Sequence, residues 1–93
     1  GGKIIPLEDH IRVREGQSLT VQVRFITADG TLLTGEEIPR INVIDGWTIV
    51  PLRDEDGDGI AEATIPVVMQ KGTRQINLSA QGFDPAVIRL TVE

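Results

Sequence analysis

Apolar and polar residues alternate along much of this 93-residue chain. Residues 19–25 show the pattern most clearly, because every odd position carries an apolar side chain and every even position a polar one. Successive side chains of a β-strand point to opposite faces of its sheet, so a period of two predicts one buried and one exposed face. The segment is therefore predicted to be a strand whose odd-numbered residues enter the core.

Three later segments repeat this alternation, namely residues 61–69, 76–80 and 88–92. In the first of them, the inward set is predicted to continue through Val67 to Met69. Further strands are predicted from shorter apolar runs, at residues 4–7 or 11–13, 41–44 and 47–52.

Turn-forming residues separate the predicted strands, at Asp29-Gly30, Asp45-Gly46 and residues 82–85. No window spaces apolar residues three and four apart over three turns, so no helix of ordinary length is predicted, and residues 33–39 are expected to hold only a short 3₁₀ turn. Pro51 and Pro66 are predicted at a sheet edge or strand end, because proline cannot donate a ladder hydrogen bond.

About seven short strands at roughly ten-residue spacing are typical of an all-β sandwich. The sequence therefore predicts one domain over residues 1–93, in which two sheets face each other across a core. Gly1 and Gly2 are interpreted as a cloning remnant or a domain boundary.

Composition narrows the functional classes. The hydrophobic fraction of 40% predicts a packed core, and the net charge of −5 argues against nucleic-acid binding, which needs clustered Lys and Arg. The chain has no cysteine, which excludes a disulfide scaffold, a thiolate nucleophile and a Cys-ligated zinc. No apolar run approaches the roughly eighteen residues of a transmembrane helix, so membrane insertion is not expected.

The order of turn-plus-strand phrases over most of the chain resembles a bacterial immunoglobulin-like domain of the kind found in tandem in invasin- and intimin-like surface proteins. The phrases that carry the resemblance are Glu15–Val21, Ala28–Gly35, Asp58–Ile65 and Gly72–Ala80. The chain departs from the family pattern between Glu36 and Leu52. The resemblance implies an immunoglobulin-like sandwich that spaces, stiffens or displays within a larger extracellular protein, and it implies no particular ligand.

The stretch DEDGDG at residues 54–59 is the sharpest candidate for chemistry. Asp54, Asp56 and Asp58 match positions 1, 3 and 5 of an EF-hand-type calcium loop, and Gly59 and Ile60 match the glycine and the carbonyl donor that follow. Position 12, which should supply a bidentate Glu, is Ile65 instead, and the alternative ligands are Glu62 at position 9 and a carboxylate from a neighbouring loop. The alternative is a solvated turn, because Asp and Gly both tolerate left-handed backbone angles.

Catalysis finds little support in the sequence. His10, Ser18 and Ser79 lie on predicted strand surfaces or near the N-terminus, with no nucleophile elbow. Trp47 is predicted to be a core anchor rather than a sugar-stacking platform, since it shares a strand side with Ile49 and the chain is poor in aromatic residues. Phe83 is expected either to contact a partner from a loop tip or to cap the open end of the sandwich.

The function expected from the sequence is that of a noncatalytic spacer or adhesive module of a larger secreted or cell-surface protein from a bacterium or archaeon. Its partners would be neighbouring domains, and a surface protein or glycan; no cofactor is required. The alternative is a calcium- or carbohydrate-binding sandwich, in one version an accessory domain of an extracellular polysaccharide-degrading enzyme.

Overall fold

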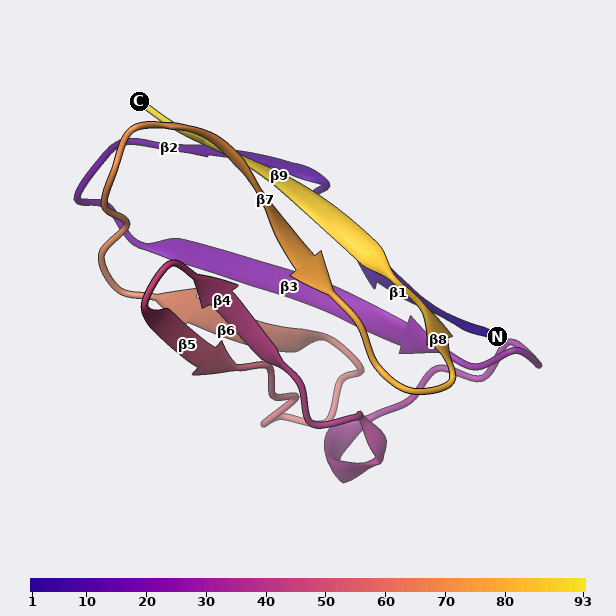
Figure 1. Ribbon diagram of the computed structural model, residues 1–93. Coiled ribbons are helices and arrows are strands. Elements are labelled where there is room, and N and C mark those ends of the chain that lie inside the picture. The colour runs from indigo at the N-terminus through magenta and orange to yellow at the C-terminus, as the bar shows by residue number, and fades with distance from the viewer.

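The computed structural model describes all residues, 1–93, and is built almost entirely of strands (Figure 1). The strands are β1 Gly2–Pro6, β2 His10–Val13, β3 Leu19–Ile26, β4 Asn42–Asp45, β5 Thr48–Pro51, β6 Ala61–Ile65, β7 Gly72–Leu78, β8 Phe83–Asp84 and β9 Ala86–Val92. One 3₁₀ turn, η1, spans Gly35–Glu37, inside the segment where a short turn was predicted. No helix here has the length and apolar character needed to cross a bilayer.

The strands form two facing layers. One sheet has the order β6-β3-β1-β8, and the other has the order β2-β9-β7, with β2 parallel to β9. The β4–β5 hairpin is paired only within itself, but β4 runs beside β7 and β5 beside β6, so the hairpin extends the second layer and reaches the edge of the first. The predicted all-β, immunoglobulin-like two-sheet sandwich is confirmed as a fold class.

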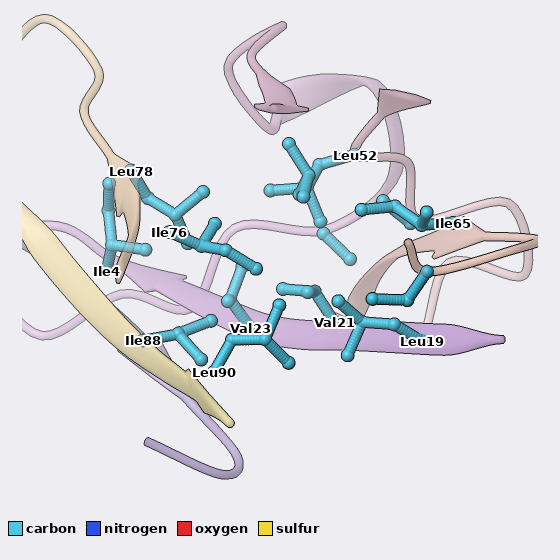
Figure 2. Packing of buried hydrophobic residues seen from close by; sticks show 14 of the residues in the cluster. Ile4, Leu19, Val21, Val23, Leu52, Ile65, Ile76, Leu78, Ile88 and Leu90 are labelled. Carbon is cyan, nitrogen blue, oxygen red and sulfur yellow. The ribbon is translucent and has the colours of Figure 1, made fainter. Parts of the chain in front are cut away.

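A single cluster of 17 buried apolar residues fills the space between the layers (Figure 2). The alternating positions of β3 are all buried, as the sequence pattern predicts, and so are those of β7 and β9 within their strands. In Figure 2, Val21 and Val23 of β3 point toward the side chains of the opposite sheet. The period of two is thus the feature of the sequence that specifies the core.

The predicted inward set of β6 is wrong beyond Ile65. Val67 and Met69 are about half exposed, whereas Val68 is fully buried. The strand ends at Ile65 because Pro66 cannot continue the ladder. The chain then changes phase at Val68. The Val68 N–H donates to Gln17 O (2.8 Å), and the Val68 carbonyl accepts from Gly16 N–H (2.7 Å). These two backbone hydrogen bonds turn the Val68 side chain inward.

The prediction that Trp47 anchors the core is also wrong, because this side chain is fully exposed. Asp45 pairs with Thr48, so Gly46 and Trp47 form a two-residue hairpin turn, and Gly46 has the positive φ of 60° that such a turn needs at its first position. Strand β5 therefore starts at Thr48 and has the opposite phase to the one predicted. Ile49 faces solvent, while Val50 packs against the core.

Phe83 closes one end of the core, which is one of the two roles predicted for it. Its ring meets Phe25 edge to face, with centroids 5.5 Å apart and an interplanar angle of 88°. Gly2, in β1, is buried beneath the same ring. A Cβ at Gly2 would lie 2.6 Å from the Phe83 ring and 2.8 Å from the carbonyl oxygen of Ile26, so this position of the fold requires glycine.

A guanidinium group fastens the hairpin to the rest of the sandwich. Arg74 of β7 donates from Nε to Asp45 Oδ1 (2.6 Å) and from Nη2 to Asp45 Oδ2 (2.9 Å), which forms a bidentate pair at the end of β4. The same group donates to the carbonyls of Gln70 (2.8 Å) and Met69 (2.9 Å) in the β6–β7 loop. Arg74 thus joins three segments that no backbone ladder connects.

We expect Arg74→Met to destabilise the domain by about 3 kcal/mol, because it leaves the carboxylate of Asp45, only 10% exposed, without its partner. The double variant Arg74→Met/Asp45→Asn should recover part of this loss. The matched control is Arg12→Met, whose contact with Glu93 is 3.8 Å long and exposed, and which should cost no more than about 0.5 kcal/mol. Urea unfolding measures all three, and equal losses for the two single variants would contradict the assignment.

Candidate functional site

The acidic loop, residues 54–59, connects β5 to β6. It brings together the three aspartates singled out from the sequence: carboxylate oxygens of Asp54, Asp56 and Asp58 all lie within 4.8 Å of one another. Asp54 is buried, whereas Asp56 and Asp58 are exposed. The proximity predicted for these residues is therefore present, but their environments differ sharply.

Asp54 is held by backbone N–H groups. Its Oδ2 accepts hydrogen bonds from Gly35 N–H (2.9 Å) and Gly59 N–H (2.8 Å), and its Oδ1 accepts one from Asp58 N–H (3.2 Å). The residue is only 7% exposed, and it is the one charged residue in the protein's buried set. The carboxylate therefore links the acidic loop to the η1 turn, and it accepts hydrogen bonds from three backbone N–H groups that would otherwise need water as a partner.

The surroundings of Asp54 favour its ionised form. Burial acts to raise the pKa of this carboxyl, but the N–H donors of Gly35 and Gly59, with smaller contributions from Asp56 and Asp58, lower it to about 2. For Asp56 the direction is opposite, because its interactions with the carboxyl groups of Asp58 and Asp54 raise its pKa. Negative charge is thus stabilised at the buried aspartate and disfavoured at its exposed neighbour.

The two exposed aspartates also shape the turn. Asp56 Oδ1 accepts from Asp58 N–H at 3.4 Å, and Asp58 Oδ1 accepts from Ile60 N–H at 2.9 Å. In both cases the side chain bonds to the backbone two residues later, as in an Asx turn. The alternate spacing of aspartates that resembles a calcium loop therefore also serves the local backbone.

Gly59 is required for a different reason. Its φ is +86°, and a Cβ there would lie 2.7 Å from a methyl carbon of Leu32. The residue is buried, and its N–H is one of the donors to Asp54. Gly59 thus packs the acidic loop against the segment that follows β3.

The residues at positions 9 and 12 of the candidate calcium loop do not join the cluster of aspartates. Glu62 Oε1, weighed as a ninth-position ligand, accepts a hydrogen bond from Gln22 Nε2 (2.9 Å) across the β6–β3 ladder. Ile65, at position 12, is fully buried in the core. The residues that remain to hold a cation are the three aspartates, with the carbonyl of Ile60 as the further sequence-predicted donor. Carboxylate and carbonyl oxygens are the ligands that calcium prefers.

A groove of about 750 Å³ runs beside the acidic loop. Arg40 and Arg53 line it together with Glu36, Asp54 and Asp56. The groove does not contain the histidine: His10 lies on β2, where its Nε2 is 2.9 Å from Thr91 Oγ1. The structure thus pairs the sole imidazole with a threonine rather than with either serine considered for catalysis.

No model of a known protein family matches this sequence, and a search of curated proteins finds no significant relative.

The sequence reasoning missed two surface features, the clamp at Arg74 and the exposure of Trp47. No sequence pattern pairs Arg74 with Asp45, because the two residues are 29 positions apart and belong to different strands. A signal for Trp47 did exist. Glycine is favoured at the first central position of a type II′ two-residue turn, and Gly46 there places Trp47 in the turn itself, which shifts the phase of the strand that follows.

We expect Asp54→Asn to destabilise the domain by roughly 2 kcal/mol, because an amide cannot accept from all three N–H donors as a carboxylate does. The ionised form of Asp54 contributes stability above pH 3.8, which is lost as pH falls toward about 2. Asp54→Asn should lack this acid-dependent loss.

The matched control is Asp56→Asn, which should stay within about 0.5 kcal/mol of the wild type at neutral pH and retain the acid-dependent loss. Urea unfolding at neutral pH, and at pH values between 3.8 and about 2, measures both effects. If Asp54→Asn and Asp56→Asn behave alike, Asp54 does not anchor the loop.

Proposed function

We propose that this protein is a noncatalytic structural module, a spacer or adhesive unit within a larger secreted or cell-surface protein of a bacterium or archaeon. The supporting observation is the position of the chain ends. The domain is elongated, 39 × 23 × 20 Å, and its N- and C-termini lie at opposite ends of the long axis (Figure 1). Neighbouring domains joined at these ends would extend along one line.

The pairing of the strands near the termini supports a mechanical role. The parallel strands β2 and β9 are paired along residues 10–13 and 89–92. Beyond the paired residues, Glu93 N–H donates to Val13 O and Glu15 N–H donates to Glu93 O, both at 2.9 Å. Tension between the termini pulls β9 along β2, so these hydrogen bonds would have to break together rather than one at a time. A module that transmits tension benefits from this geometry.

We expect Glu15→Pro to lower the force needed to unfold the domain, because it deletes the N–H that bonds to Glu93 O. Glu15 precedes Gly16, which has φ of +90°, and Gln17 N–H bonds to Arg14 O (3.0 Å), so proline suits the geometry of this turn. The free energy of unfolding should therefore change by less than about 1 kcal/mol.

Single-molecule stretching of tandem copies measures the unfolding force, and urea unfolding measures the equilibrium stability. Thr20→Val is the control. It removes a hydroxyl contact between Thr20 of β3 and Thr64 of β6 (3.0 Å), and both of these strands belong to the sheet that does not contain β2 and β9. The control should keep the wild-type unfolding force. An unchanged force in Glu15→Pro, or the same fall in both variants, would argue against a role for the β2–β9 ladder under tension.

Calcium binding at the acidic loop is the second candidate function, favoured by the three carboxylates within 4.8 Å of one another. The raised pKa of Asp56 reflects their mutual interaction, which a divalent cation would relieve. Carbohydrate binding, alone or as an accessory to a polysaccharide-degrading enzyme, has weaker support. Trp47 is exposed as a stacking platform must be, but the neighbouring Ile44 and Ile49 offer sugar hydroxyls no hydrogen-bonding groups.

If the loop binds calcium with a dissociation constant of about 10⁻³ M, then about 10 mM calcium should add about 1.4 kcal/mol of stability. Differential scanning calorimetry would show this as a rise in melting temperature. Asp56→Asn should abolish the rise without changing the melting temperature in the absence of calcium, and magnesium at the same concentration should have little effect. An unchanged melting temperature for the wild type would remove calcium from the proposed function.

A further inference from the structure

The β4–β5 hairpin carries three of the four most exposed large apolar residues of the protein. Ile44 of β4 pairs directly with Ile49 of β5, and these residues are 54% and 61% exposed. Trp47, in the turn between the strands, has no part of its side chain covered. We call Ile44, Trp47 and Ile49 the hairpin patch.

The hairpin patch is not a by-product of a loosely attached hairpin. The opposite face of the same two strands is seated in the core through Val43, which is fully buried, and Val50. The turn is fixed at its base by the bidentate contact of Asp45 with Arg74. The hairpin therefore presents the three apolar side chains on a rigid support, which lowers the entropic cost of binding.

Charge is almost absent from the hairpin itself. Asp45 is the only charged residue between Ile41 and Leu52, and Arg74 neutralises it. The adjoining segment, residues 53–58, carries five charged side chains, and the whole chain has a net charge of −5. Two copies of the protein therefore repel each other over much of their surface but meet no such barrier at the hairpin patch.

The size of the hairpin patch agrees with a weak interface. A fully exposed tryptophan offers about 250 Å² of surface. With Ile44 and Ile49 the total is roughly 450 Å² per copy, within the range of the largest apolar patch on a monomer and below the approximately 800 Å² per partner of a standard stable complex. Residues at the rim would add to this area. Met69 is one of them, because Arg74 Nη2 donates both to the Met69 carbonyl and to Asp45 at the base of the turn.

We propose that the hairpin patch is a self-association surface, through which two copies of this domain form a weak, two-fold symmetric dimer. The same uncharged apolar surface is present on both partners, as an isologous interface requires. A fully exposed tryptophan on the same hairpin as two exposed isoleucines matches the composition of interface centres, which are enriched in aromatic residues and depleted of charge. The absence of polar groups on Ile44 and Ile49 disfavours a sugar at the same place.

Analytical ultracentrifugation of the intact domain tests the proposal over a range from about 5 µM to about 500 µM, where an interface of this size should associate. The weight-average mass should rise from 10.1 kDa toward twice that value. Raising the salt concentration should strengthen association, because salt screens the repulsion between two acidic chains. Emission of the sole tryptophan should shift to shorter wavelength as the protein concentration rises.

Trp47→Ser should weaken association at least tenfold, with no change in melting temperature because the side chain has no neighbours to lose. Val87→Ser is the matched control: this apolar residue is 46% exposed but lies on β9, away from the hairpin, and its variant should associate like the wild type.

A mass that stays at 10.1 kDa throughout the range would overturn the proposal, as would wild-type association in Trp47→Ser or an equal loss in Val87→Ser. A monomer whose tryptophan emission changes on adding a soluble glucan oligosaccharide would also overturn it and assign Trp47 to a glycan. None of these results bears on the unfolding force across β2 and β9, so the spacer role stands or falls separately.

Discussion

The structure depends on the burial of one face of each sheet against the other, because the domain has no α-helix to cover its core and no disulfide. With 93 residues, the chain can assemble only one such core, and 17 apolar residues supply it. Every other feature lies where this requirement leaves room for it. The solvent-facing side of the β3–β6 pair holds the hydroxyl and amide contacts Thr20–Thr64 and Gln22–Glu62. The acidic loop sits at a strand connection, and the hairpin completes one side of the core while exposing its own outer face.

The need to bury one face of each sheet also explains which parts of the fold could be predicted from the sequence. The buried residues of β3, β7 and β9 were predictable because a strand with one buried face keeps the same phase over its whole length. The errors at Val67, Met69 and Trp47 arose where that phase is reset, by a proline in one case and by a two-residue turn in the other. Local turn geometry decides such resets, and a hydrophobic pattern read across the turn carries the wrong phase onward.

The acidic loop shows a second limit of sequence reasoning. Its spacing correctly indicated that three carboxylates would lie together, since alternate residues in a tight turn stay close. The spacing did not indicate that Asp54 would turn inward and accept three backbone hydrogen bonds. Two of the donors belong to the loop itself, but the third, Gly35, comes from a turn 19 residues earlier, and the local spacing carries no information about it. Long-range polar contacts of this kind, like the one between Arg74 and Asp45, leave no periodic trace in a sequence.

The acidic loop is anchored through the single side chain of Asp54, so the residues at its ends are structural and the residues at its tip are not. Asp54 and Gly59 fix the two ends of the loop, while Glu55, Asp56 and Gly57 are exposed to solvent. Gly57 has a φ of +74°, which strains any other residue, so an insertion at the tip has to keep this glycine. This three-residue tip is thus suited to accept foreign peptide sequences, as the variable loops of other sandwich scaffolds do. A small cysteine-free domain that carries an inserted epitope at this tip would be a display vehicle usable in reducing as well as oxidising compartments.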